Sequence, residues 1–535
     1  MSRDASAPPS PAEAPMGGHP RRWAILGVLV VSLLVVVLDN TVLNVAMKTI
    51  ADPDAGIGAS QSELAWSINS YTLVFAGLLF TFGVLGDRIG RRIMLVGGMV
   101  VFGLTSLASA FADTPTQLIW FRAGMGIGAA AILPATLSII SNVFDPRERG
   151  KAIGLWAGAV GLGAAIGPVL GGFLLEHFWW GSVFLINVPV VVIGIIAIFM
   201  LVPESKDPKP AKLDVVGVLL SIIGLTLLTY GIIEGGDSGD WGQLKVWGTL
   251  AGSVVVLVAF VLYERKIPNP ALDVTLFRNR MFAGATGTIG LVFFAAMGLM
   301  FFFAFYLQAV RQLSPIQTGL LFVPFAAAQL IFAPRSAAMV KKYGARAVSS
   351  VGMLIVTASF LVYFTFGTDT PMWLVAVMFF VQGAGMANVM PPATEAVQAS
   401  VPREKAGVGS AVSNTIRQVG GALGVAVLGS VLSQIYRDKI GPTLDSVPNL
   451  SAEAHEAASS SIMGTYGVVE HSGGAADALI APANDAFISA MHTTTLAAAV
   501  IAFIGVIVSW TLLPGKRGGG SQAEAPAAEP VLMEA

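Results

Sequence analysis

Long apolar stretches alternate with short polar segments along almost the whole chain. A helix that crosses a membrane needs about 20 mostly apolar residues, and by this measure the pattern predicts about 14 such helices. Polar tails at 1–20 and 514–535 are predicted to be disordered. We expect the helices at residues 23–46, 64–85, 93–111, 117–141, 152–175, 182–202, 214–234, 245–263, 283–307, 316–339, 347–367, 372–394, 406–434 and 489–513.

The composition supports this interpretation. Of the 535 residues, 55% are hydrophobic and 12% are charged, and the mean hydropathy is +0.74. Soluble globular domains carry about 25% charged residues, so the sequence predicts an all-α polytopic membrane protein. The sequence contains no Cys, which excludes disulfide bonds and thiol chemistry within this chain.

Positive charges are distributed unequally between alternate loops. If the N-terminus is cytoplasmic, the predicted cytoplasmic loops hold 18 Lys and Arg residues and the opposite loops hold 5. Cytoplasmic loops of membrane proteins are enriched in Lys and Arg. We therefore expect a multi-pass protein of the cell (inner, cytoplasmic) membrane. Both tails would be cytoplasmic, and the long polar loop 437–488 would be extracytoplasmic.

A repeated motif indicates two related halves. The fourth predicted helix ends with Pro-Ala-Thr at 134–136, and Pro-Arg-Glu-Arg-Gly follows at 146–150. The twelfth ends with Pro-Ala-Thr at 392–394, and Pro-Arg-Glu-Lys follows at 402–405. Shared low complexity is the alternative, but the match falls in a loop, where apolar composition does not produce it. The offset predicts two six-helix halves, residues 21–202 and 281–513, joined by a linker, 203–280, with two further membrane helices.

The first predicted helix carries a carboxylate within its apolar run. Asp39 is followed by Asn40, Thr41 and Asn44. A charged side chain at the centre of a membrane helix costs about 2.5–3.5 kcal/mol on insertion scales. A helix that served only as an anchor would not keep such a group. We predict that Asp39 carries protons and that its three polar neighbours line a substrate cavity.

Three further charged residues are candidates for a role in proton coupling or in the substrate cavity. Arg122 lies near one end of the fourth helix, where it can either snorkel to the membrane surface or pair within the membrane. Arg417 lies deep in the thirteenth helix and is a candidate for the polar lining of the cavity. Glu395 directly follows the twelfth helix, and a solvated helix end is the favoured alternative to a role at the cavity mouth.

The segment between the second and third helices reads Gly-Val-Leu-Gly-Asp-Arg-Ile-Gly-Arg-Arg at 83–92. Glycines permit tight turns and close helix contacts, and Asp87 can pair with a basic neighbour. An ordinary basic cytoplasmic loop would explain the arginines but not this spacing. We predict a conformational gating cluster formed by Gly83, Gly86, Asp87, Arg88, Gly90, Arg91 and Arg92.

The fifth helix has glycines every three or four residues. They form one smooth face, and Pro168 removes a backbone donor and bends the helix. Static tight packing is the alternative to a role in hinging or sliding. We predict that this face takes part in gating through Gly163, Gly167, Pro168, Gly171 and Gly172.

These motifs resemble those of the major facilitator superfamily. The 83–92 spacing is similar to its loop signature, and the segment 118–128 is similar to its fourth-helix motif, whose arginine (here Arg122) is associated with proton transfer. The pattern Gly-x-x-x-Gly-Pro-x-x-Gly-Gly at 163–172 is similar to the antiporter motif, which marks exporters. The segments 38–46, 180–189 and 417–424 resemble the 14-helix drug:proton antiporter (EmrB/QacA-like) family.

The resemblance implies proton-coupled efflux of hydrophobic, often cationic drugs or antibiotics by alternating access between the halves. The sequence has neither a Gly-x-x-x-x-Gly-Lys-Ser/Thr phosphate loop nor His residues at metal-binding helical spacing. We therefore expect a secondary transporter and not an enzyme, with no cofactor, metal or nucleic acid. Its expected partners are the lipid bilayer, drug-like substrates and protons, and a monomer is expected. Export of an endogenous metabolite, or a channel or non-transporting receptor, are the alternatives.

Overall fold

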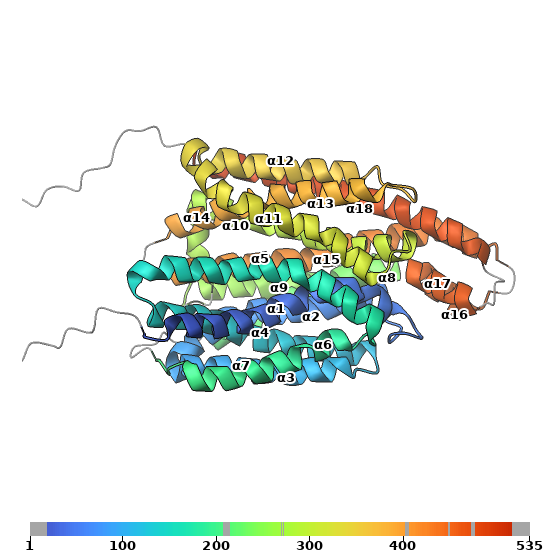
Figure 1. The fold of residues 1–535 in the computed structure, drawn as a ribbon. Coiled ribbons are helices and arrows are strands. Elements are labelled where there is room, and N and C mark those ends of the chain that lie inside the picture. The colour runs from blue at the N-terminus through green and yellow to red at the C-terminus, as the bar shows by residue number, and fades with distance from the viewer. Residues whose placement is uncertain are drawn as a thin grey trace, which may run out of the picture.

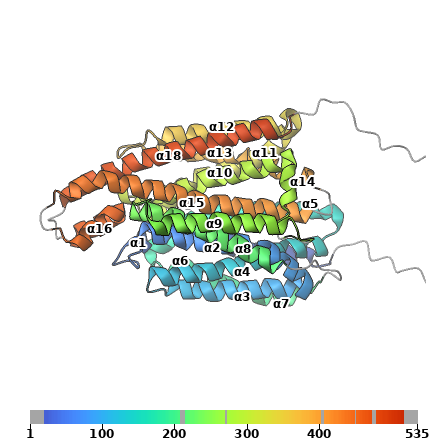
Figure 2. The same ribbon diagram turned by 180° about the vertical axis from the view of Figure 1, so that it is seen from behind.

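The computed structural model describes residues 19–206, 214–268, 270, 272–401, 406–447, 450–471 and 477–515. The described residues form a long bundle of helices without strands (Figure 1). The start of α1 (Arg22–Ala51) and the end of α18 (Ile480–Leu512) lie at one end of the bundle, which we call the terminal end (Figure 1). The helices α16 (Ala452–Ser460) and α17 (Ile462–His471) lie at the opposite end, which we call the loop end (Figures 1 and 2).

The N-terminal half begins with two long helices whose ends are marked by local sequence. Ser60 and Glu63 form a capping box at the start of α2, and Gly90, at a φ of 130°, separates α2 from α3. Thr114 caps α4, where Pro115 occupies the first turn. The helices of this half are α1 (Arg22–Ala51), α2 (Gln61–Ile89), α3 (Arg91–Ala110), α4 (Pro115–Val143), α5 (Pro146–His177), α6 (Ser182–Leu185) and α7 (Asn187–Leu201).

Two helices, α8 (Val215–Ser238) and α9 (Leu244–Glu264), separate this half from the C-terminal half in the chain. The C-terminal half starts after a short 3₁₀ helix, η1 (Val274–Arg278), and its first helix ends in a π-helical turn, η2 (Tyr306–Val310). The long helices of this half are α10 (Arg280–Phe305), α11 (Pro315–Tyr343), α12 (Ala345–Tyr363), α13 (Met372–Ala387), α14 (Met390–Ala399), α15 (Ala406–Leu444) and α18 (Ile480–Leu512), the last preceded by η4 (Asp477–Leu479).

The two halves repeat one packing plan. In the N-terminal half α1 packs on α5, α2 on α4, and α3 on both α4 and α7. In the C-terminal half α10 packs on α15, α11 on α13, and α12 on both α13 and α18. Glycines occupy matching contacts, since Gly126 meets the Tyr71 backbone and Gly383 meets the Phe325 backbone. The second copy of the loop motif, at 402–405, lies outside the described residues.

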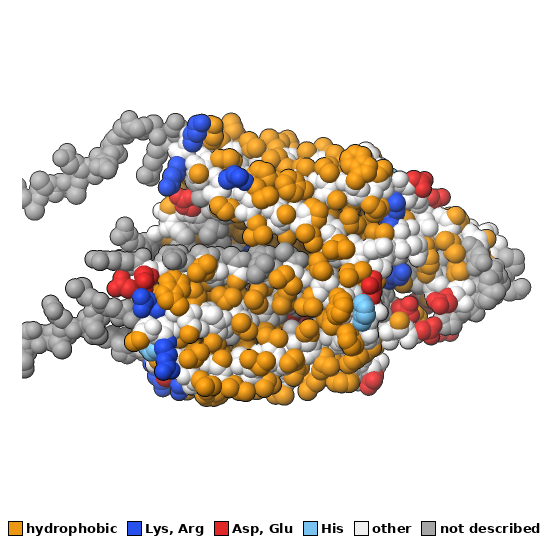
Figure 3. Space-filling model, in the orientation of Figure 1, with side chains coloured by type: hydrophobic (Ala, Val, Ile, Leu, Met, Phe, Trp, Pro, Cys, Tyr) orange, Lys and Arg blue, Asp and Glu red, His pale blue; other side chains and the backbone are white. Residues whose placement is uncertain are grey.

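Apolar side chains cover most of the side of the bundle that faces the viewer in Figure 3. Within the described residues, 12 helices are long and apolar enough to cross a membrane, or 13 when the bent α2 is included. The long helix α5 packs on α1 and α11 but is not in this set. The prediction of an all-α polytopic membrane protein is confirmed, while the number of 14 spans stays a prediction.

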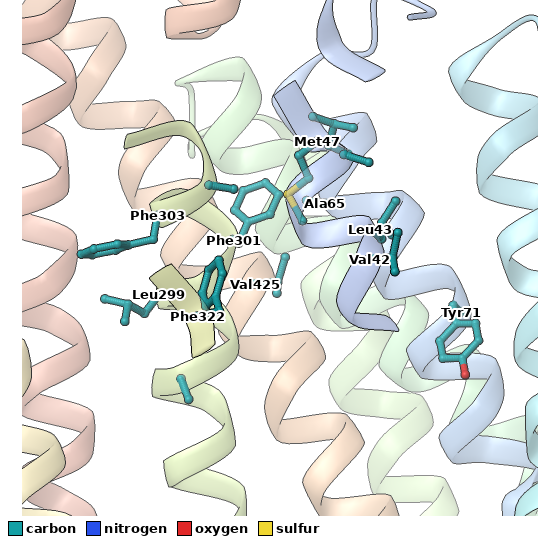
Figure 4. Packing of buried hydrophobic residues seen from close by; sticks show 14 of the residues in the cluster. Val42, Leu43, Met47, Ala65, Tyr71, Leu299, Phe301, Phe303, Phe322 and Val425 are labelled. Carbon is teal, nitrogen blue, oxygen red and sulfur yellow. The ribbon is translucent and has the colours of Figure 1, made fainter. Parts of the chain in front are cut away.

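Aromatic side chains of α10 are buried both toward the N-terminal half and within the C-terminal half. Phe301 and Phe303 of α10 are fully buried. Figure 4 shows them on different sides of the helix, with Phe301 directed toward Met47 and Ala65 of the N-terminal half. This core fixes the position of α10 against the N-terminal half.

The segment 437–488 differs from the expected polar loop. Helix α15 continues to Leu444, α18 begins at Ile480, and α16 and α17 fold between them. Tyr436, Ile440 and Leu444 are buried beneath these short helices. The predicted helices ended at 434 and began at 489 because the prediction followed only the apolar stretches. Helices α15 and α18 both extend beyond these stretches into more polar sequence.

Candidate functional site

Asp39 of α1 and Arg122 of α4 form an ion pair inside the N-terminal half. Arg122 Nη1 donates to Asp39 Oδ2, and each side chain is only 1% exposed. An arginine keeps its charge in proteins, so the carboxyl group is the member of this pair that can exchange a proton. Removing one partner of such a buried pair leaves an uncompensated charge.

Several neighbouring groups fix the geometry of this pair. Asn187 Nδ2 donates to Asp39 Oδ1 at 3.4 Å and to Ser106 Oγ at 3.0 Å. Arg122 Nε donates to the Ser67 carbonyl at 3.3 Å. The Arg122 guanidinium also lies 4.6 Å from the Tyr71 ring centre, a distance that gives a favourable cation–π contact. Polar and aromatic groups from α2, α3 and α7 thus surround the pair.

The polar residues that follow Asp39 lie at the edge of this cluster. Asn40 Nδ2 donates to Tyr71 Oη at 2.9 Å, which connects it to the ring beneath Arg122. Thr41 Oγ1 donates to carbonyl groups of its own helix, at 3.0 and 3.1 Å. Asn44 Nδ2 donates to the Asn40 carbonyl at 3.3 Å. Asn40 therefore belongs to the cluster, whereas the side-chain hydrogen bonds of Thr41 and Asn44 stay on α1.

The glycines of α5 meet α1 on the opposite side of this helix. An added methyl group at Gly163 would lie 2.9 Å from Val37, and one at Gly171 would lie 2.9 Å from Val42. One at Gly167 would lie 2.8 Å from the Thr41 Cβ. All three distances are shorter than van der Waals contact, so α1 and α5 approach closely along the face that the sequence predicts.

The predicted gating cluster at 83–92 lies at the terminal end. Asp87 pairs with Arg91 at 2.8 Å, and Arg88 is exposed. Arg92 lies 3.8 Å from Glu204, whose Oε1 also accepts from the Arg92 backbone N–H at 3.1 Å. Gly83 and Gly86 lie in α2 and Gly90 at its end. A third pair, Arg22 with Glu148 at 2.6 Å, joins the start of α1 to that of α5.

Two predicted residues lie away from the ion pair. Arg417 of α15 is half-buried in the C-terminal half, where its guanidinium lies 5.6 Å from the centre of the Phe293 ring. Glu395 is exposed, but it lies inside α14 and does not directly follow the twelfth helix as predicted, because the helical segment continues past the apolar stretch to Ala399. The structure therefore brings Asp39 and Arg122 together but places Arg417 and Glu395 elsewhere.

The two halves contact each other closely at the loop end. An added methyl group at Gly172 of α5 would lie 2.5 Å from the Ile316 Cα of α11, and Gly319 of α11 packs on the Pro168 carbonyl. Lys48 Nζ donates to the Gln308 carbonyl at 2.9 Å, and Gln308 Nε2 donates to the Val45 carbonyl at 2.8 Å. These contacts close the junction between the halves at this end.

Sequence reasoning did not select four residues that complete these sites. Asn187 and Tyr71 surround the ion pair, while Glu204 and Glu148 bind arginines at the terminal end. Asn187 is a polar amide within the mostly apolar segment 180–189, and this is the feature of the sequence that could have identified it. The two glutamates lie in polar segments, where their partners depend on the fold.

The protein-family model of the Major Facilitator Superfamily matches residues 29–425 of this sequence. The chain is 32% identical to the tetracenomycin C resistance and export protein of Streptomyces glaucescens, over 81% of this chain and 80% of that protein. It is 32% identical to the multidrug efflux pump LfrA of Mycolicibacterium smegmatis, over 91% and 95%. It is 35% identical to the puromycin resistance protein pur8 of Streptomyces alboniger, over 80% and 85%.

Solved structures share the fold. A bacterial homolog of the human lysosomal transporter Spinster, in an inward-facing and unoccupied conformation, superposes with a TM-score of 0.64. The match has 17% sequence identity and covers 92% of this chain and 98% of that one. A peptide transporter, POT, in complex with sulfate gives a TM-score of 0.59 at 16% identity, over 89% and 96%.

Proposed function

Because this chain belongs to the Major Facilitator Superfamily, we propose that it exports hydrophobic, often cationic drugs or antibiotics in exchange for protons. Members of this family are transporters, so the chain is a multi-pass membrane transporter and not an enzyme. Relatives named for drug efflux and antibiotic resistance support the substrate class. In this proposal the protein is a monomer of the cytoplasmic membrane, with its terminal end facing the cytoplasm.

The buried ion pair of Asp39 and Arg122 is the observation that carries the proposal. A proton that binds Asp39 removes the negative charge opposite Arg122, which stays charged. An arginine buried without a charged partner is unfavourable, so protonation changes the free energy of the closed arrangement. A proton gradient can drive transport only through such a difference between states.

Contacts of α1 with α5, and of α5 with α11, connect Asp39 to the junction between the halves. Asp39 lies on α1, which meets the glycine face of α5 at Gly167. Gly172, further along α5, contacts Ile316 of the other half. A displacement of α1 therefore moves α5 and alters the contact that closes the loop end. The ion pairs at the terminal end, such as Asp87 with Arg91, would rearrange when the halves rock.

The test is Asp39→Asn in proteoliposomes with an imposed pH gradient. Asparagine keeps the size of the side chain but cannot take up a proton. We expect drug-driven proton flux to fall to the level of empty vesicles, while a fluorescent drug still binds the purified variant. Full-rate proton flux in the variant would refute the proposal.

Matched variants separate this effect from misfolding. Asp54 is an exposed carboxylate at the loop end, so Asp54→Asn should keep the wild-type flux. Asp39→Glu keeps a carboxyl group and should keep part of the coupled transport. Thermal unfolding in detergent identifies any variant that fails to fold.

A further inference from the structure

A pocket opens at the loop end, directly over the junction between the halves. Its volume is about 220 Å³. The N-terminal half contributes Asp52 and Pro53, the turn after α10 contributes Ala309, and α17 contributes Tyr466 and Glu470. Three parts of the chain that are distant in sequence therefore enclose one space.

Helix α17 forms the outer wall of this pocket and is attached to the C-terminal half. Tyr466 Oη lies 3.0 Å from Asn484 Oδ1 of α18 and donates to it. Tyr436 of α15 and Thr465 of α17 share a hydrogen bond of 2.6 Å. Toward the N-terminal half, an added methyl group at Gly467 would lie 3.9 Å from the Pro53 Cγ. The wall thus reaches across the junction from one half to the other.

The backbone beneath the pocket is irregular. Helix α10 ends in the π-helical turn η2, and π-helical turns are frequent at functional sites. Gln312 follows at a φ of 53°, the only positive φ of a non-glycine residue in the described part of the chain. Such strained residues cluster at ligand clamps and switch regions. The same turn binds Lys48 through the Gln308 carbonyl, so it also connects the halves.

The charges of the pocket favour a cation at its rim. Among the described residues, the exposed Glu470 has no ion-pair partner. Asp52 also lines the pocket and is half-buried, and its Oδ1 accepts from the Asp54 and Ala55 N–H groups at 2.9 Å. Acidic side chains also gather over α16 and α17 (Figure 3). The Lys48 ammonium also lines the pocket and donates to the Gln308 carbonyl at 2.9 Å, so this positive charge is held by the turn η2. Met463 and the Tyr466 ring add the apolar and aromatic surface that organic cations prefer.

We propose that this pocket is an exit site for organic cations and that α17 is its movable outer wall. The proposal rests on the proposed export function, because it places the site where substrate would leave the junction between the halves. A substrate released between the halves meets the pocket before it reaches solvent. The wall must separate from Pro53 before the loop end can open.

A disulfide across the wall tests its movement. The chain contains no Cys, so the double variant Pro53→Cys/Gly467→Cys can form only the intended bond. We expect oxidation to stop efflux and reduction to restore it, while each single variant transports under both conditions. Gly287→Cys/Val508→Cys is a control within one half, where the added methyl group would lie 3.5 Å from Val508. Full efflux by the cross-linked protein would overturn the movable wall, and failure of the pair to form a disulfide would overturn the contact of α17 with Pro53 on which the proposal rests.

Charge variants test the ligand class. Asp52→Asn/Glu470→Gln should raise the KM for a cationic dye by about two- to fivefold, the range of one exposed ion pair. The KM for an uncharged substrate should stay unchanged, and Glu453→Gln, an exposed change on α16, should affect neither. Equal KM values for the cation in the double variant and the unmodified protein would overturn the exit site. If the unmodified protein exports no drug, the proposed function fails instead.

Discussion

Arg122 and Phe379 occupy equivalent positions in the two halves. Arg122 lies four residues before Gly126, which contacts Tyr71, and Phe379 lies four residues before Gly383, which contacts Phe325. Both are almost fully buried. The repeated backbone therefore carries an arginine in one half and an aromatic ring in the other.

Asp39, the partner of Arg122, also has an apolar residue at the equivalent position of the C-terminal half. Gly167 contacts Thr41 in the N-terminal half, and Gly424 contacts Phe294 in the C-terminal half. Asp39, two residues before Thr41, thus corresponds to Val292, which is fully buried. Phe379 instead stacks on Phe322 and lies next to the rings of Phe303 and Tyr363. The ion pair has an apolar counterpart, so the titratable chemistry of this position is confined to the N-terminal half.

We predict that Arg122→Gln is less stable than the double variant Asp39→Asn/Arg122→Gln. The single change leaves the Asp39 carboxylate buried without its cation, which costs about 3–5 kcal/mol. The double change removes both charges and restores most of that stability. Thermal unfolding in detergent measures the difference, and neither variant should show coupled transport. Equal melting temperatures for the two variants would contradict the prediction.

The face of α5 gives a second prediction. Gly167→Ala adds a methyl group 2.8 Å from the Thr41 Cβ, and overpacking of this kind costs about 1–3 kcal/mol. We expect a lower melting temperature and slower efflux. Gly97→Ala is the matched control, because Gly97 is a helix glycine with no atom within 4 Å of an added methyl group. A similar effect of both changes would show that loss of the α1–α5 contact is not the cause.

The motifs can be identified from short stretches of sequence, but the residues that surround each motif in the fold come from other parts of the chain. The glycine spacing of α5 identifies a smooth face, but only the fold shows that α1 covers it from Leu34 to Val42. From its position along the helix, the Arg122 side chain could equally reach the membrane surface or pair inside the protein. Contact of Gly126 with the Tyr71 backbone rotates α4 so that Arg122 faces α1. Such a rotation depends on two helices and is not encoded in the pattern of one.

The segment 437–488 shows a different limit. The helices α16 and α17 have 9 and 10 residues, so they are too short to leave a long apolar run in the sequence. The position of α17 depends on Tyr436 and Tyr466, whose hydrogen bonds join it to α15 and α18, and Thr465 of α17 donates to the Ala458 carbonyl of α16. The pocket under α17 could not be predicted because its walls come from three distant segments.

Glu204 should stabilise the start of α3. Gly90 precedes this helix and offers no side chain to cap it, whereas Glu204 Oε1 accepts from the Arg92 N–H at 3.1 Å. A carboxylate at a helix N-terminus is favourable, and loss of a cap costs about 0.5–2 kcal/mol. Glu204→Ala should therefore lower the melting temperature more than Glu204→Gln, whose amide oxygen still accepts. Glu176→Ala, an exposed change on α5, is the control and should have little effect.

Asn187 should couple the gradient to transport by orienting Asp39. Its amide donates to Asp39 Oδ1 at 3.4 Å, and Asn187→Leu removes that donor while keeping the side-chain size. We expect efflux driven by a pH gradient to fall, while exchange of drug across vesicles without a gradient continues, because exchange needs no net proton movement. Ser106→Ala is the control, since it removes the second acceptor of Asn187 at 3.0 Å and keeps the donor to Asp39. An equal loss of gradient-driven efflux and exchange in Asn187→Leu would assign the residue to packing and not to coupling.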